Sequence, residues 1–256
     1  TGVVDSPDVD LNVSREILQQ TPVVATIKKQ LTKRVLKKLR DLAKSEEGAA
    51  QYNDFWGEMG HLLKEGIHED DGNKKLLTGL LRYTTTTSEG ELRSLAQVKE
   101  DMVEGQDAIW YLADVDKDRI ASKPVLEGFK RRNWEVLLMT DPVDEWVVMS
   151  TREFEDVPLK SAAHGELPEE DEEERSEEEQ QARNEATPLA SWMGEMLSGD
   201  VAEVRLSSRL TDSPSVLVNK EGSMGANMEN ILKAANQQIF SDKRVLEINP
   251  CLLYTS

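Results

Sequence analysis

Residues 108–141 read AIWYLADVDKDRIASKPVLEGFKRRNWEVLLMTD, and this stretch decides the fold of the middle of the chain. Two short apolar runs rich in strand-forming residues, 108–114 and 134–141, enclose a segment that favours one or two helices split near Pro124. Strand, helix and strand of these lengths form a right-handed crossover, which makes the two strands parallel. The sequence therefore predicts an α/β unit over residues 95–159.

Each predicted strand ends in an aspartate, Asp114 or Asp141. The carboxyl ends of parallel strands are the edge where such sheets usually bind ligands, so one hypothesis is a stand-alone α/β enzyme that uses these carboxylates. Aspartate is also a common helix-start residue after a strand, and no glycine-rich phosphate loop accompanies the pair. We therefore expect both aspartates to be cap residues.

Three amphipathic segments precede this unit and predict a small helical bundle over residues 15–82. The first helix follows Ser14, a natural N-cap, and continues to about Lys44, while the others cover residues 49–65 and 73–82. The first helix is predicted to bury apolar residues three and four apart, namely Ile17, Leu18, Val24, Ile27, Leu31, Val35, Leu39 and Leu42. The second is predicted to bury Tyr52, Phe55, Trp56, Met59 and Leu63.

Residues 166–185 hold eleven acidic residues and two basic ones. Such a run cannot bury a core, so it predicts an acidic linker or charged helix between domains, over residues 160–187. A helix that ends at Gly199 and several short strands follow it and predict a truncated α+β unit over residues 188–250. The tail, residues 251–256, continues no earlier pattern and stays unassigned.

The composition excludes several classes of partner. The 256 residues carry a formal net charge of -18, which argues against binding to nucleic acid or to an anionic membrane surface. No stretch approaches the roughly 18 apolar residues of a membrane span, so a cytoplasmic protein is expected. A single cysteine, Cys251, and three scattered histidines predict no metal site, and His61, His68 and His164 are expected to be surface or cap residues.

Several motifs in one order resemble the Hsp90 family of heat-shock chaperones, in its bacterial HtpG form. The most specific is GVVDSPDVDLNVSREILQQ, residues 2–20, and the resemblance extends to about Pro250. The motifs that follow in family order are LLKEGIHED (62–70), LLRYTTT (80–86), EVLLMTDPVDEW (135–146), RLTDSPSVLV (209–218) and NMENILKA (227–234).

The resemblance implies a domain organisation. Residues 1–159 resemble the later part of the family's middle domain, and residues 188–250 resemble the start of its carboxy-terminal dimerisation domain. The full-length family protein is an ATP-dependent, homodimeric chaperone that binds partly folded clients and holds ATP and magnesium in an amino-terminal domain. This chain resembles none of that domain, so we expect it to bind no nucleotide alone, to have no enzymatic activity alone, and to be monomeric or weakly associating.

The resemblance also implies a role for Arg15 and Gln19, which match residues that reach the terminal phosphate of ATP across a domain boundary. A guanidinium there can stabilise charge on the transferred phosphoryl group, as an arginine finger does. An arginine at a helix amino end is otherwise disfavoured, by about 0.3–1 kcal/mol. The alternative is that both side chains merely solvate the helix start.

Two groups of residues are implied to contact clients. One comprises Glu145, Trp146 and Met149, and for it the alternative is a tryptophan anchored in the core. The other lies on one face of a predicted helix and comprises Met224, Met228, Ile231 and Leu232. Methionines suit a surface that accepts many partners, although ordinary core packing explains the same spacing.

Overall fold

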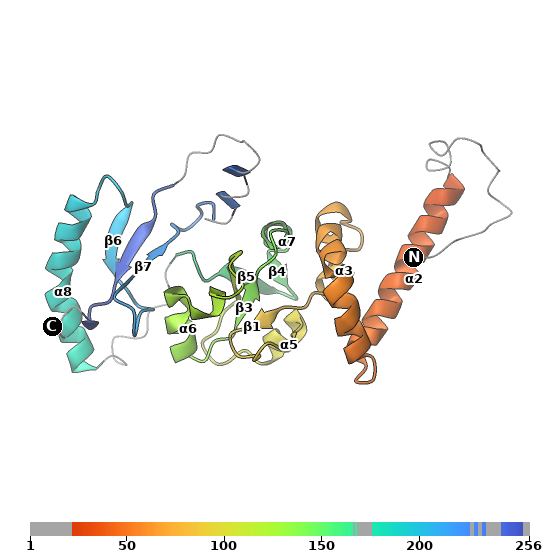
Figure 1. Cartoon of the computed structure of the whole chain (residues 1–256), viewed down its shortest axis with the longest axis horizontal. Coiled ribbons are helices and arrows are strands. Elements are labelled where there is room, and N and C mark those ends of the chain that lie inside the picture. Colours follow the sequence, from red (N-terminus) through yellow and green to blue (C-terminus); the bar gives the residue numbers. More distant parts are fainter. Residues whose placement is uncertain are drawn as a thin grey trace.

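The computed structural model describes residues 22–165, 167, 176–225, 228–229, 232–233 and 242–252. Its elements follow one another along an elongated molecule, with α2 at one end and α8 at the other (Figure 1). The helices are α2 (Pro22–Lys44), α3 (Ala49–Glu69), α4 (Lys74–Thr78), α5 (Leu95–Glu100), α6 (Glu127–Arg131), α7 (Asp144–Ser150) and α8 (Glu177–Met196). The strands are β1 (Thr84–Thr85), β2 (Ile109–Ala113), β3 (Val136–Met139), β4 (Glu153–Phe154), β5 (Val157–Ser161), β6 (Glu203–Leu206), β7 (Ser215–Val218) and β8 (Val245–Ile248).

The central sheet has the strand order β1-β3-β2-β5-β4. Strand β2 pairs in parallel with β3, from Trp110 opposite Val136 to Ala113 opposite Met139, and in parallel with β5 on its other side. The predicted parallel crossover is therefore confirmed. Its connection contains two single-turn 3₁₀ helices, Ile120–Ser122 and Pro124–Leu126, before the short α6, so the split near Pro124 is also confirmed.

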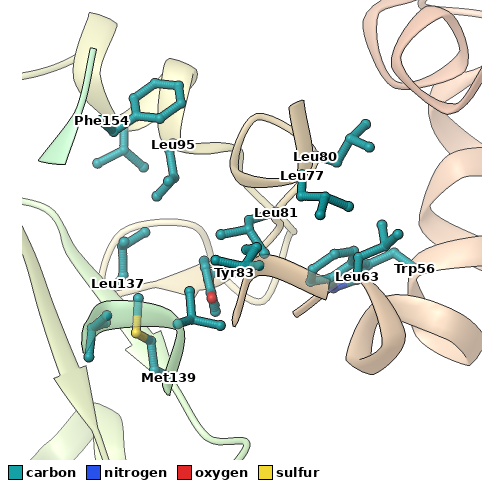
Figure 2. Packing of buried hydrophobic residues seen from close by; sticks show 14 of the residues in the cluster. Trp56, Leu63, Leu77, Leu80, Leu81, Tyr83, Leu95, Leu137, Met139 and Phe154 are labelled. Atoms are coloured by element: carbon teal, nitrogen blue, oxygen red, sulfur yellow. The ribbon is translucent and has the colours of Figure 1, made fainter. Parts of the chain in front are cut away.

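A first hydrophobic cluster joins the helical region to this sheet. Figure 2 shows Trp56 and Leu63 of α3 near the leucines that follow α4, with Leu137 and Met139 of β3 further along the same cluster. Burial of each such side chain stabilises the fold by about 1.5–3 kcal/mol. The cluster therefore fixes α3 against the sheet.

The helical bundle differs from its prediction in which residues are buried. Within α2, Leu36 is buried, whereas Leu31 and Val35 are exposed, and Met59 of α3 is exposed as well. The reason is that α2 and α3 lie close near their connection and splay apart beyond it (Figure 1). Only the carboxyl-terminal half of α2 therefore has a partner surface. The third helix, α4, is shorter than predicted. It ends at Thr78, whereas the sequence predicts a helix over residues 73–82.

The second sheet has the strand order β6-β8-β7, with β8 parallel to β6 and antiparallel to β7. Helix α8 packs along strand β6 at one edge of this sheet (Figure 1). It begins with a capping box between Ser176 and Glu179, so the acidic residues from Glu177 onward belong to a helix rather than to an extended linker. At the other limit of the predicted linker, Lys160 and Ser161 belong to β5.

A second hydrophobic cluster packs the two sheets together. It combines residues of the central unit, such as Leu112, Val125 and Phe129, with Val218 of β7 and Val245 of β8. The two sheets therefore share one core, and the junction between them is the place where side chains from both units meet.

Candidate functional site

Helix α7 follows strand β3 and is fixed at its amino end by two aspartates. The backbone N–H of Asp141 donates to Asp144 Oδ2 over 3.1 Å, and the N–H of Val143 donates to Asp141 Oδ1 over 3.2 Å. Asp144 is fully buried and accepts from Lys64 Nζ over 2.7 Å and from the Tyr83 hydroxyl over 3.0 Å. Burial raises the pKa of Asp144, although Lys64 and these hydrogen bonds oppose the increase. These contacts anchor α7 to α3.

Of the two strand-end aspartates, Asp141 accepts a hydrogen bond at the start of α7, whereas Asp114 does not cap the 3₁₀ helix after β2, which begins only at Ile120. Asp114 accepts from the backbone N–H of Asp116 over 2.9 Å and forms an ion pair with Lys123. Asp141 caps α7 and lies 3.6 Å from Lys64 Nζ. Both carboxylates therefore have partners in the turns that follow the two strands.

Helix α7 presents two large apolar side chains to solvent. Trp146 is 37% exposed and Met149 is 58% exposed. One side of the Trp146 ring lies near the His68 ring of α3, with 5.8 Å between the ring centroids. Glu145, between the anchoring Asp144 and Trp146, is buried instead. Of the three residues implied here, the structure therefore places two at the surface.

The segment around Met224 lies beside α7. The carbonyl oxygen of Ser223 lies 3.1 Å from Nε2 of His164, and a Cβ added at Gly225 would lie 3.8 Å from Oε1 of Glu145. Met224 itself is 39% exposed. We use the term exposed patch for the exposed Trp146 and Met149 of α7 and the exposed Met224, whose neighbour Gly225 lies near Glu145 of α7.

The remaining predicted residues do not join the exposed patch. Met228 is 5% exposed, so for this residue the structure favours the alternative of core packing. Leu232 is partly buried. Ile231 lies outside the described residues, as do Arg15 and Gln19.

A cleft of about 200 Å³ lies at the carboxyl ends of β2 and β5, between the two sheets. Its polar side chains include Tyr111, Glu145 and His164. Burial and the nearby charge of Glu145 raise the pKa of Tyr111 to about 12, against the effect of its hydrogen bond with Ser161. Burial lowers the pKa of His164, against the effect of the Ser223 carbonyl.

Sequence reasoning missed Tyr111 and His164. His164 was expected at the surface or at a cap, but the turn after β5 brings it against Asn219 and the Ser223 carbonyl. Tyr111 lies within a continuous apolar run, so the sequence pattern gives no sign that it lines a cleft. Only the position of both residues near the carboxyl ends of parallel strands could have indicated a site.

Comparison with known proteins identifies the family. Residues 1–252 match the family model described as Hsp90 protein. The chain belongs to the Hsp90 family. It is 42% identical over 252 residues to Chaperone protein HtpG of Nocardia farcinica, 43% identical over 253 residues to that of Mycobacterium leprae, and 42% identical over 250 residues to that of Mycobacterium tuberculosis. The family predicted from the motifs is thus confirmed.

Each of these alignments covers 97% of this chain and 38% of the relative. The chain therefore spans well under half the length of the curated Hsp90 relatives that it matches. Within the described residues, no helix is long and apolar enough to cross a membrane. The same part of the chain contains no group of three or more His, Cys, Asp or Glu residues that could hold a metal ion.

Proposed function

We propose that this chain is the part of an ATP-dependent Hsp90 chaperone that holds partly folded client proteins on the exposed patch. The observation that carries the proposal is the exposure of Trp146, whose ring lies near His68, together with the exposure of Met149 and Met224. A tryptophan held in this way supplies a large contact area at little entropic cost. The flexible methionines suit clients of many shapes.

The second part of the proposal concerns ATP. Arg15 and Gln19 would donate hydrogen bonds to the terminal phosphate of ATP bound, with magnesium, by the amino-terminal domain of the full-length protein. This chain would then complete an ATPase site without hydrolysing ATP alone. The proposal also includes a homodimeric full-length protein in the cytoplasm, with this chain monomeric or weakly associating.

Client binding can be tested with a labelled, permanently unfolded protein and fluorescence anisotropy. We expect Trp146→Ala to weaken binding by about 1–2 kcal/mol, or roughly five- to thirtyfold. The matched control is Trp192→Ala, because Trp192 is 57% exposed but lies on α8 at the far end of the molecule. Equal losses in both variants would contradict a specific role for the exposed patch.

The ATP role can be tested by mixing this chain with the isolated amino-terminal domain of a bacterial relative and measuring phosphate release. We expect the chain alone to release no phosphate and the mixture to exceed the isolated domain. Arg15→Ala and Gln19→Ala should remove the stimulation, whereas Lys29→Ala, on the exposed face of α2, should keep it. Stimulation that survives Arg15→Ala would refute the proposed phosphate contact.

A further inference from the structure

Helix α2 carries an excess of positive charge in a chain whose net charge is -18. It holds one acidic residue, Asp41, and eight basic residues. The eight basic side chains are all exposed, namely Lys28, Lys29, Lys33, Arg34, Lys37, Lys38, Arg40 and Lys44. Within the described part of the chain, their only ion pair is that of Arg40 with Asp41. The helix therefore presents a basic surface to solvent.

Exposed apolar side chains lie on the same helix. Leu31 and Val35 are both exposed, and because four positions separate them they lie on one face. Lys28 and Lys38 each lie three positions from one of these residues and therefore flank them. Helix α3 leaves the amino-terminal part of α2 uncovered, because the two helices splay apart away from their connection (Figure 1).

Helix α8, at the opposite end of the molecule, has the complementary character (Figure 1). Its exposed apolar side chains are Leu189, Trp192 and Met196, and their spacing of three and four positions places them on one face. The helix also carries five glutamates and a single arginine, Arg183. Glu185 lies four positions before Leu189, so it adds a carboxylate to the same face.

The order of the apolar and charged residues along each helix favours an antiparallel pairing. The exposed apolar residues of α2 end at Val35, and basic residues continue to Lys44. In α8 the order is reversed, since three glutamates occupy the first turn and the exposed apolar residues begin at Leu189. At about 1.5 Å per residue, the 23 residues of α2 and the 20 residues of α8 have similar lengths, so they can pair along most of both helices.

We propose that α2 of one chain packs antiparallel against α8 of a second copy of this chain. The pairing covers the exposed apolar residues of both helices and sets the lysines of α2 against the glutamates of α8. Two copies of α2, or two copies of α8, would instead bring like charges together. Because α2 and α8 lie at opposite ends of an elongated molecule, the contact forms between chains (Figure 1).

This contact is heterologous, because different surfaces of the two chains meet. Each pairing leaves one α2 and one α8 open, so further copies can add. One pair of helices is a small interface, so the association is weak and depends on concentration. Neither helix contributes to the exposed patch, and the inference is therefore independent of the proposed client site.

Analytical ultracentrifugation of the whole chain tests the inference. The average mass of the wild-type protein should rise as its concentration increases from about 10 to 300 µM. Val35→Glu combined with Lys38→Glu makes the α2 face acidic, whereas Trp192→Ala combined with Met196→Ala removes the apolar face of α8. Each double variant should associate at least about tenfold more weakly than wild type.

An equimolar mixture of the two double variants tests whether α2 binds α8 in particular. The α2 variant retains an intact α8, and the α8 variant retains an intact α2. The mixture should therefore form a complex of two chains and nothing larger, although neither variant associates alone. A contact of α2 with α2, or of α8 with α8, predicts instead that one of the variants still associates by itself.

The matched control is Val115→Glu combined with Lys117→Glu, which makes the same replacements at an exposed valine and an exposed lysine of the central unit. It should associate as wild type does. Trp146→Ala combined with Met149→Ala repeats the α8 replacements on α7 and tests the rival contact through the exposed patch. Thermal unfolding verifies that each variant is folded.

Four results would overturn the inference. They are a wild-type protein that stays monomeric over the whole range, wild-type association in either double variant, no complex in their mixture, or loss of association in the α7 variant. If a double variant does not fold, Lys28→Glu on α2 and Met196→Glu on α8 supply a second pair, with the same expected results. Both positions are exposed, so these replacements leave the core intact.

Discussion

The carboxylate of Glu127, in α6, accepts a hydrogen bond of 2.7 Å from the backbone N–H of Thr211, 84 positions later in the chain. The same oxygen accepts from the N–H groups of Asp212 and Ser213 over 3.0 and 3.2 Å, and the Ser213 hydroxyl donates to the other oxygen. Consecutive backbone N–H groups of this kind form an anion-binding nest. This nest ties the loop between β6 and β7 to the central unit.

Replacement of Glu127 by glutamine should destabilise the chain by about 1.5–3 kcal/mol at pH 7, because the charge-assisted hydrogen bonds become neutral ones. Burial alone would raise the pKa of Glu127, but the hydrogen bonds from Ser213, Thr211 and Asp212 bring it below its ordinary value of 4.5. A lowered pKa stabilises the fold above the unfolded-state value and ceases to do so as the pH falls through the folded-state value.

Urea unfolding of wild type and Glu127→Gln between pH 7 and pH 3 measures this effect. The difference in free energy of unfolding should shrink once the pH falls below about 4.5. Glu104→Gln, at an exposed position, serves as control and should change stability by less than about 0.5 kcal/mol. A difference that stays constant over the whole range would refute the role of the charge.

Arg209→Met should cost about 1–3 kcal/mol, because it removes buried hydrogen bonds to Glu247 and to a backbone carbonyl, although Arg205 still pairs with Glu247. Arg209 is 1% exposed and donates to Glu247 Oε2 over 2.8 Å and to the carbonyl of Ala162 over 2.7 Å. Arg119→Met is the control, since Arg119 is exposed and 3.9 Å from Asp116, and it should cost at most about 1 kcal/mol. Similar midpoints of urea unfolding for the two variants would contradict a stabilising role for the buried contacts of Arg209.

Lys64→Met should reveal how strongly α7 depends on its anchor. The variant should lose about 3–5 kcal/mol at pH 7, because Asp144 remains buried without its cation. The pKa of Asp144 is already raised in the folded protein and should rise further without Lys64. A raised carboxyl pKa penalises the fold above that pKa and not below the unfolded value, so acid should reduce the deficit.

The free energy of unfolding of Lys64→Met, measured at pH 7 and pH 5, tests whether the loss of stability depends on the charge of Asp144. The deficit relative to wild type should be smaller at pH 5. Lys130→Met is the comparison, because Lys130 is an exposed lysine whose Nζ donates to the backbone carbonyl of Ala121. A deficit that is independent of pH would show that Lys64 acts through packing alone.

The sequence predicts the parallel strands well because continuous apolar runs such as 134–141 have few ways to be buried other than inside a covered sheet. The burial of α2 is harder to predict, since Leu36 rather than Val35 is covered only because of where α3 crosses it. Periodicity alone cannot supply that crossing point. The same limit applies to His164, whose surroundings come from a sheet that begins more than thirty residues later.

The methionines of the candidate site show most clearly that the sequence pattern does not tell a buried residue from an exposed one. They also allow a direct test. Met149 and Met228 were both implied to contact clients, but Met149 is 58% exposed and Met228 is 5% exposed. Met228→Ala should therefore cost about 2–5 kcal/mol of stability by leaving a cavity. Met149→Ala should change stability by less than about 0.5 kcal/mol and should weaken client binding severalfold.

Thermal unfolding and client anisotropy on the same two variants separate stability from binding. At a temperature where both are folded, Met228→Ala should bind the unfolded client as wild type does, because the deleted atoms lie inside the protein. Leu189→Ala, at a partly exposed position on the distant α8, should be neutral in the binding assay. If Met228→Ala weakens client binding while its unfolding temperature is unchanged, Met228 contacts the client directly and the buried arrangement is not the one that binds.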